Sequence, residues 1–319
     1  MRILFVAFPN SVHVLRWIQQ VTDQEWDIHL FPSIDVGLIL PEFRNITVHH
    51  SIYSPQTNLH ESVKERGLRI GLPFVRKPLA SVFWSIARLL TLLRSRRNPD
   101  YRVVDLQRTI ERIQPDIVHS IEFQHAGYLV LAVKERMGTR FPKWIATNYG
   151  SDVYLYGRLN AHRDKVSSIL ELCDYYDCEC ERDVQLAKDM GLKGQVVYPI
   201  LPNAGGFDLD EFNSTARQDP VSERTQIILK GYQHFAGRAL VALQAFARCR
   251  DLLKDYTIAI YSTDPDVHIV AEILQQDTGL DIKILPHLSH NEILQEFGRS
   301  RVYIGLSISD AISTSMLEA

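Results

Sequence analysis

Two acidic side chains near the end of the chain, Asp310 and Glu318, are well suited to hold a hydroxyl-rich ligand. They stand eight positions apart, with Thr314 and Ser315 between them at the expected start of a helix. A helix start presents unpaired backbone N–H groups and the positive end of the helix dipole, which favour a phosphate. These residues therefore predict a phosphate site at the start of this helix.

A structural alternative explains the same residues. Ser315-x-x-Glu318 satisfies the capping-box pattern, in which the glutamate only ties the first helical turn to its own cap. Capping boxes are far commoner than nucleotide sites, so these residues alone leave both interpretations open.

A second group of candidates lies near position 235. The expected strand 225–229 leads into a glycine-flanked loop that holds Lys230 and Arg238 and precedes a helix. Cations at such a position can neutralise a leaving diphosphate. The alternative is that both side chains are solvated surface cations.

Polar residues also follow three expected strands in the first half, which span 3–8, 116–121 and 143–147. Parallel α/β sheets bind ligands at the carboxyl ends of their strands, so these loops are candidate ligand contacts. Histidine is also common in satisfied cores, and an Asp after a glycine turn often only anchors its loop. The candidates are Pro9, Asn10, His125, Tyr149, Gly150 and Asp152.

Short apolar runs alternate with amphipathic segments along the whole chain, which predicts parallel sheets with helices on both faces. At 319 residues the chain is long enough for two separate cores. A Pro- and Gly-rich break near position 203 separates them. We therefore expect a first domain over 1–202, a linker over 203–224 and a second domain over 225–319.

The segment 305–319 resembles the donor-site signature of retaining glycosyltransferases of the family 4 type, in which two glutamates are separated by seven residues. Here the first acid is Asp310, which is one methylene shorter. Two weaker similarities support the resemblance. Residues 149–152 stand where the family often has His-Gly-Ser-Asp, and Lys230 and Arg238 are displaced by one or two positions from its paired cations.

The resemblance implies the GT-B fold, two tandem Rossmann-like domains facing each other across a cleft, with the second domain incomplete because family members continue beyond this point. It implies sugar transfer, with retention of configuration, from a nucleotide-diphosphate sugar to a sugar or lipid-linked acceptor, without a metal or other cofactor. Asp310 would contact the donor sugar, Glu318 the ribose, and Thr314 and Ser315 the diphosphate. His125 and Asp152 would lie near the reacting sugar.

Several departures favour a rival hypothesis, a nucleotide-sugar-binding partner or regulatory subunit that transfers nothing. Tyr149 stands where the family has histidine, and Ile121 aligns with another family histidine near the reacting sugar. An epimerase or phosphorylase on the same fold is a third interpretation, for which the sequence shows no site motif.

The composition of the chain indicates which classes of partner are expected. The formal net charge of −3 argues against a general nucleic-acid binder. The four cysteines have no zinc or redox spacing, so we expect reduced thiols in the cytoplasm. Basic residues at both ends of the segment 76–97 surround a leucine-rich helical pattern with Trp84. This segment is either an ordinary helix with a solvated face or a peripheral contact with an anionic membrane.

Overall fold

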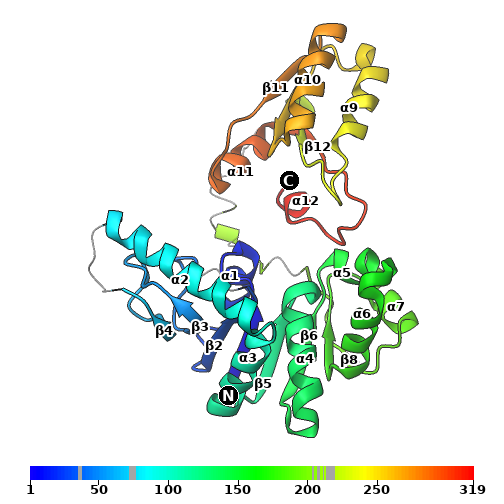
Figure 1. Cartoon of the computed structure of the whole chain (residues 1–319). Helices are drawn as coiled ribbons and strands as arrows, with labels where there is room; N and C mark the ends of the chain where they lie inside the picture. The colour runs from blue at the N-terminus through cyan, green and yellow to red at the C-terminus, as the bar shows by residue number, and fades with distance from the viewer. Residues whose placement is uncertain (35–37, 72–76, 203–204, 207–208, 211, 213–219) are drawn as a thin grey trace. The chain divides into compact units, whose positions relative to one another are not determined.

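The computed structural model describes residues 1–34, 38–71, 77–202, 205–206, 209–210, 212 and 220–319. The chain divides into two compact units, Met1–Gly206 and Phe207–Ala319 (Figure 1). The expected linker 203–224 falls largely outside the described residues.

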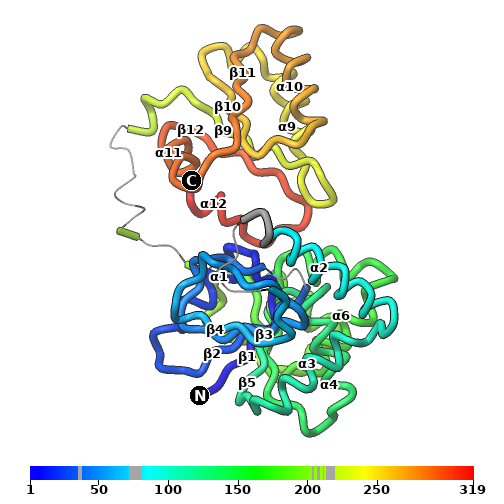
Figure 2. The backbone as a smooth tube through the Cα atoms, turned by 60° about the vertical axis from the view of Figure 1, so that its left-hand side comes forward, coloured from blue at the N-terminus to red at the C-terminus, as the bar shows by residue number. Residues whose placement is uncertain are grey.

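An eight-stranded sheet, parallel throughout, forms the centre of the first unit. The strand order is β4-β3-β2-β1-β5-β6-β7-β8, and Figure 2 shows β1 to β4 side by side. The strands are β1 (Arg2–Ala7), β2 (Asp27–Pro32), β3 (Thr47–Tyr53), β4 (Lys64–Arg69), β5 (Ile117–Ile121), β6 (Lys143–Thr147), β7 (Tyr175–Asp177) and β8 (Gln195–Val196).

Helices cover both faces of this sheet because alternate strand residues point to opposite sides. Leu4 and Val6 of β1 pack with α3, α4, α6 and α7, whereas Ile3 and Phe5 pack with α1. The helices are α1 (Val12–Gln19), α2 (Lys77–Arg97), α3 (Tyr101–Ile113), α4 (Tyr128–Met137), α5 (Gly150–Tyr154), α6 (Asn160–Leu172) and α7 (Glu181–Asp189).

The second unit repeats this plan on a smaller scale. Its parallel sheet has the order β11-β10-β9-β12, with one core on each face. The strands are β9 (Gln226–Lys230), β10 (Thr257–Tyr261), β11 (Asp281–Ile284) and β12 (Ser300–Ile304). The helices are α9 (Ala239–Arg248), α10 (Pro265–Thr278), α11 (His290–Arg299) and the short α12 (Thr314–Glu318).

Each sheet has one point where the chain order reverses, between β1 and β5 in the first unit and between β9 and β12 in the second. Doubly wound folds bind ligands at such switch points, beyond the carboxyl ends of the strands. The loops after β1 and β5 hold Asn10 and His125, and the loops after β9 and β12 hold Lys230 and Asp310. The fold thus places the predicted candidates where ligands are expected.

The predicted α/β class is confirmed, but β3 and β4 were absent from the predicted strands. Two histidines interrupt the apolar pattern of β3, although all seven of its residues are buried. His50 Nε2 lies 3.1 Å from the carboxylate of Glu65, and His49 belongs to a buried hydrogen-bonded chain. Arg112 donates to His49 Nδ1 at 3.0 Å, and His49 Nε2 lies 2.9 Å from His29 Nδ1. His29 Nε2 then lies 3.2 Å from Asp27.

The rings of His49 and His29 are both neutral in this chain, because each accepts a hydrogen bond at Nδ1, His49 from Arg112 and His29 from His49. Burial lowers the pKa of His49 to about 3, and it lowers the pKa of His29 as well. Since unfolded histidine binds a proton near pH 6.5, the stability that comes from neutral His49 is present above that pH. It is lost as the pH falls toward about 3.

We predict that His49→Gln makes the first unit less sensitive to acid. Between about pH 7 and about pH 5.5 the wild-type protein should lose about 1 kcal/mol more unfolding free energy than the variant. All four tryptophans precede residue 145, so urea unfolding followed by tryptophan fluorescence reports on this unit. Equal losses in the two proteins would contradict the prediction.

Candidate functional site

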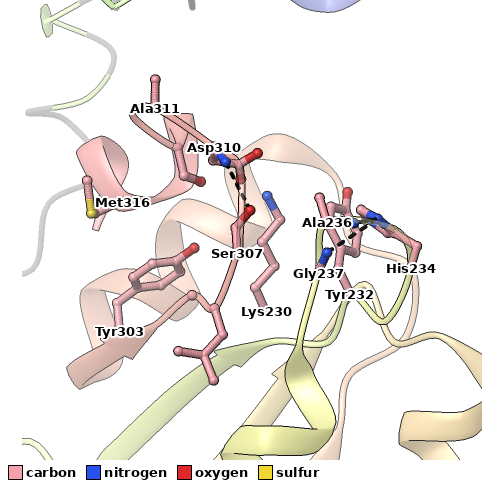
Figure 3. A pocket seen from close by; sticks show the side chains of 13 residues that line it. Lys230, Tyr232, His234, Ala236, Gly237, Tyr303, Ser307, Asp310, Ala311 and Met316 are labelled. Carbon is pink, nitrogen blue, oxygen red and sulfur yellow. Dashed lines mark hydrogen bonds between the residues drawn. The ribbon is translucent and has the colours of Figure 1, made fainter. Parts of the chain in front are cut away.

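A cavity of about 150 Å³ opens at the switch point of the second unit (Figure 3). It lies between the loop after β9 and the loop after β12, so both segments singled out in the sequence contribute to it. Its walls are formed by Lys230, Tyr232, His234, Ala236, Gly237, Tyr303, Gly305, Leu306, Ser307, Asp310, Ala311, Ser313 and Met316.

Backbone hydrogen bonds join the two loops. The N–H of Arg238 donates to the carbonyl of Leu306, and the N–H of Ile308 donates to that of Ala236, both at 3.1 Å. Gly237 lies between these bonds and forms an antiparallel bridge with Ser307. A Cβ atom on Gly237 would lie 2.5 Å from the carbonyl oxygen of Tyr232, so only glycine fits without movement.

Lys230 supplies the ammonium group of the cavity. It is the last residue of β9, and its Nζ lies 4.5 Å from the centroid of the Tyr232 ring. Burial lowers the pKa of Lys230, whereas the charges of Asp310 and Glu318 act to raise it. Figure 3 shows the amine reaching up between Tyr232 and Ser307 toward Asp310. The structure therefore brings together one predicted cation and two predicted acids.

The two acids have different surroundings. The Asp310 side chain is exposed, and its backbone N–H donates to Ser307 Oγ at 3.1 Å. Glu318 is only 7% exposed and lies 2.8 Å from His290 Nε2 at the start of α11. Asp310 is thus accessible to solvent, whereas a ligand at Glu318 would meet His290 as well.

The capping-box alternative for Ser315 and Glu318 is wrong. The N-cap of α12 is Ser313, which makes no side-chain capping bond, so Ser315 lies inside the helix and not at its cap. Thr314 and Ser315 are half-buried in the first turn, beside the cavity residues Ser313 and Met316.

Arg238 is used differently from Lys230. Its guanidinium donates to the carbonyls of His234 and Gly237, both at 2.6 Å, and of Phe235 at 3.2 Å. It braces its own loop and does not line the cavity. A phosphate contact by Arg238 stays a prediction.

Sequence reasoning did not select several cavity residues, among them Tyr232, His234, Tyr303 and Ser307. Tyr232 and Ser307 follow the ends of β9 and β12 and carry polar groups, which was an available signal. Tyr303 lies within β12, and nothing in the sequence separates it from a core residue.

In the first unit, the loops after β1 and β5 are close to each other. The rings of Phe8 and His125 meet edge to face, with centroids 4.9 Å apart. Pro9 is buried and accepts a backbone hydrogen bond from Leu40, and Asn10 is exposed. The His125 side chain is 52% exposed, and its Nδ1 lies 3.4 Å from the carboxylate of Glu122.

His125 and His119 differ in the direction of their pKa shifts and in burial. The side-chain hydrogen bond with Glu122 raises the pKa of His125. His119 is buried against Thr147, at 2.7 Å from the hydroxyl, and burial lowers its pKa to about 3. His119 is therefore an internal residue, whereas His125 is half-exposed.

The loop after β6 is built around Asp152, which is 2% exposed. Its carboxylate accepts from the backbone N–H groups of Tyr149 at 2.9 Å and Phe123 at 3.0 Å. Burial, and then the charge of Glu122, raise the pKa of Asp152. Gly150 begins α5, and the Tyr149 hydroxyl is buried without a hydrogen-bond partner. These contacts match the alternative in which Asp152 anchors its loop.

In the part of the chain that the structure describes, no group of three or more His, Cys, Asp or Glu side chains could hold a metal ion. None of the described helices is long and apolar enough to cross a membrane.

Comparison with known proteins was made by sequence and by structure. No family model and no curated protein matches the chain by sequence. Among solved structures, it is similar to an α,α-trehalose-phosphate synthase (UDP-forming) from Burkholderia xenovorans in complex with glucose-6-phosphate. The TM-score is 0.62 at 10% identity, over 99% of this chain and 82% of that one.

Two further structures are similar to it. Anabaena Alr3699/HepE in complex with UDP-glucose gives a TM-score of 0.56 at 11% identity, over 100% of this chain and 78% of that one. UDP-GlcNAc 2-epimerase from Methanocaldococcus jannaschii gives 0.52 at 11% identity, over 95% and 78%. At these identities the likeness shows the fold, which is the GT-B type with two Rossmann-like domains. Transferases and epimerases share it, so the fold does not choose between them.

We predict that Gly237→Ala opens the bonds between the two cavity loops, because the added methyl cannot fit beside Tyr232. Hydrogen exchange at the Arg238 and Ile308 amides should become about tenfold to hundredfold faster, which corresponds to about 1–3 kcal/mol of local stability. Gly279→Ala is the control for backbone strain without a clash, since its φ of +71° disfavours alanine but a Cβ there meets nothing within 4 Å, and it should leave exchange at the Arg238 and Ile308 amides unchanged. Unchanged protection in Gly237→Ala would show that the loops do not depend on this close approach.

Proposed function

We propose that this protein transfers a sugar from a nucleotide-diphosphate sugar to a sugar or lipid-linked acceptor. The observation that carries the proposal is Lys230, whose half-buried ammonium faces a cavity between the switch-point loops. A cation there is suited to a diphosphate, and exposed Asp310 beside it is suited to the hydroxyls of a sugar. The proposal includes retention of configuration and independence from metals.

The donor site has further residues. Lys230 and Arg238 stabilise the charge that develops on the leaving diphosphate, and Thr314 and Ser315 at the start of α12 contact its oxygens. Glu318 accepts hydrogen bonds from the ribose hydroxyls. Stabilisation of the leaving group is the main requirement of this reaction, because bond cleavage leaves the electron pair on the diphosphate.

The acceptor is bound by the first unit. Asn10 and His125 lie at its switch point, and Pro9 shapes the loop that carries Asn10. Tyr149 and Gly150 belong to the neighbouring loop and would also contact the acceptor. Asp152 holds this loop in place by accepting two backbone hydrogen bonds.

The alternative is a protein that binds a nucleotide sugar without transferring it. Two contacts favour it. Arg238 already donates to three carbonyls of its own loop, and Glu318 is already hydrogen-bonded to His290. Both proposals require donor binding, so they differ only in turnover.

We predict that Lys230→Met weakens binding of UDP-glucose by about tenfold to hundredfold, because a hydrogen-bonded ion pair with phosphate is lost. Titration calorimetry measures this. Lys283→Met is the matched control, since Lys283 is an exposed lysine on β11. Release of nucleoside diphosphate from a panel of nucleotide sugars and acceptors then separates transfer from binding. Failure of every nucleotide sugar to bind the wild-type protein would refute both hypotheses.

The proposal also includes a location. We propose that the protein is cytoplasmic and that residues 76–97 bind peripherally to an anionic membrane. Within the described part of α2, Val82, Ile86, Leu89 and Leu93 recur at helical spacing and are 40–55% exposed. Their apolar stripe ends in exposed Arg96 and Arg97, so one helix face combines apolar and basic groups.

Other features of α2 fit this contact. Exposed Arg88 lies over the ring of Trp84, at 5.7 Å from its centroid. The helix packs on β3, and the neighbouring edge strand β4 carries Lys64, Arg66 and Arg69. Anionic lipids attract such a cluster, and apolar side chains then insert at the interface.

We predict that Arg96→Gln with Arg97→Gln lowers partitioning onto vesicles of phosphatidylglycerol and phosphatidylcholine about 30-fold, at about 1 kcal/mol for each arginine. Leu89→Ser with Leu93→Ser should also reduce it, because the inserted side chains are lost. Cosedimentation measures both changes. Ile269→Ser with Ile273→Ser on α10 is the matched control, since these isoleucines are equally exposed. Binding to pure phosphatidylcholine, or equal binding by all variants, would contradict the electrostatic contact.

A further inference from the structure

Glu122, the residue directly after β5, has an unusual backbone. Its φ of 70° and ψ of 157° lie in a region that L-residues rarely adopt. Such a conformation costs of the order of 1–3 kcal/mol, and it persists where the surroundings compensate for it. Glycine would adopt it without this cost, so the presence of a glutamate calls for an explanation.

The carboxylate provides part of the explanation. Glu122 is 4% exposed, and its Oε1 accepts from the backbone N–H groups of His125 at 2.7 Å and Ala126 at 2.6 Å. These bonds cap the helical turn Phe123–Gly127 that precedes α4. Capping alone uses one oxygen. The second oxygen, Oε2, lies toward His125 Nδ1 at 3.4 Å.

This second contact fixes the chemistry of the imidazole. When Nδ1 donates to Glu122, the neutral ring carries its lone pair on Nε2, which can then accept a hydrogen bond. Phe8 holds the ring from the loop after β1, and the side chain remains half-exposed. The arrangement therefore presents one acceptor nitrogen at the switch point of the first unit.

Other charged groups near His125 do not replace Glu122. Asp152 uses its carboxylate on the backbone of Tyr149 and Phe123, and it acts on Glu122 and not directly on the imidazole. Tyr128 in α4 bonds His162. Glu122 is the charged side chain that the structure places on His125.

We propose that Glu122 is a positioning residue that orients His125 so that its Nε2 accepts the hydrogen of the acceptor's reacting hydroxyl. This inference rests on the proposed transfer reaction and adds a role to its acceptor side. As the hydroxyl oxygen bonds to the anomeric carbon of the sugar and the bond from that carbon to the diphosphate breaks, the hydroxyl proton passes to Nε2, and Glu122 stabilises the imidazolium that forms.

Glu122→Gln tests the inference without removing the cap. The glutamine oxygen can still accept from the His125 and Ala126 N–H groups, whereas the negative charge is lost. Glu122→Gly is the second variant, since it removes the carboxylate together with its two capping bonds while glycine relieves the strain of the positive φ. Either variant can carry the test if the other fails to fold.

The first measurement is the NMR titration of the His125 imidazole in the full chain. We expect its midpoint to fall by about one pH unit in both variants, because an adjacent opposite charge is removed. The exposed His60 and His268 are internal references and should not move. A His125 midpoint that stays at the wild-type value would overturn the positioning role, whatever the activity of the protein.

The second measurement is UDP release from UDP-glucose with water as acceptor, followed against pH. We expect Glu122→Gln to lower the rate about tenfold or more and to shift its pH profile with the His125 titration, while calorimetric binding of UDP-glucose stays unchanged. An unshifted profile would refute the role of Nε2. If the wild-type protein binds no nucleotide sugar, the proposed function fails instead, and the NMR result still stands for the Glu122–His125 contact.

Discussion

The close backbone approach between the loops after β9 and β12 is the constraint on which the candidate site depends. Parallel strands on either side of a switch point end near each other, but their loops diverge unless something joins them. Here Gly237 bridges to Ser307, and its missing Cβ lets it lie against the Tyr232 backbone of its own loop, so Lys230 and Asp310 line one cavity although they are eighty residues apart in sequence. In the first unit the corresponding loops meet through side chains, the rings of Phe8 and His125.

Much of this could be predicted from sequence because apolar periodicity fixes strands and helices locally. The apolar runs before Pro9, after Lys143 and before Lys230 all became strands that end at candidate loops. The buried strand β3 could not be predicted in this way. Its histidines find partners that are distant in sequence, His49 in Arg112 and His29, and His50 in Glu65, so its polar composition hides its place in the sheet.

Prediction of the candidate site from the sequence has the same limit, because contacts between residues distant in sequence are not visible in it. Residue type, position after a strand and the family resemblance together selected Lys230, Asp310 and His125. They did not reveal which acceptors the cations would bind. Arg238 was expected to contact a phosphate, but in the structure its guanidinium donates to three backbone carbonyls of its own loop. Glu122 was overlooked because its importance lies in a backbone angle and a buried contact, which a single sequence does not display.

The bracing by Arg238 has a consequence for any ligand that reaches it. The carbonyls of His234, Phe235 and Gly237 would lose their donor when the guanidinium turned toward an anion. Part of the energy of anion binding would then be spent on rearranging this loop, so affinity would be lower than the contact alone implies. The conformation of this loop would then differ between the empty and the ligand-bound protein, so the hydrogen bonds of Arg238 would indicate whether an anion is bound.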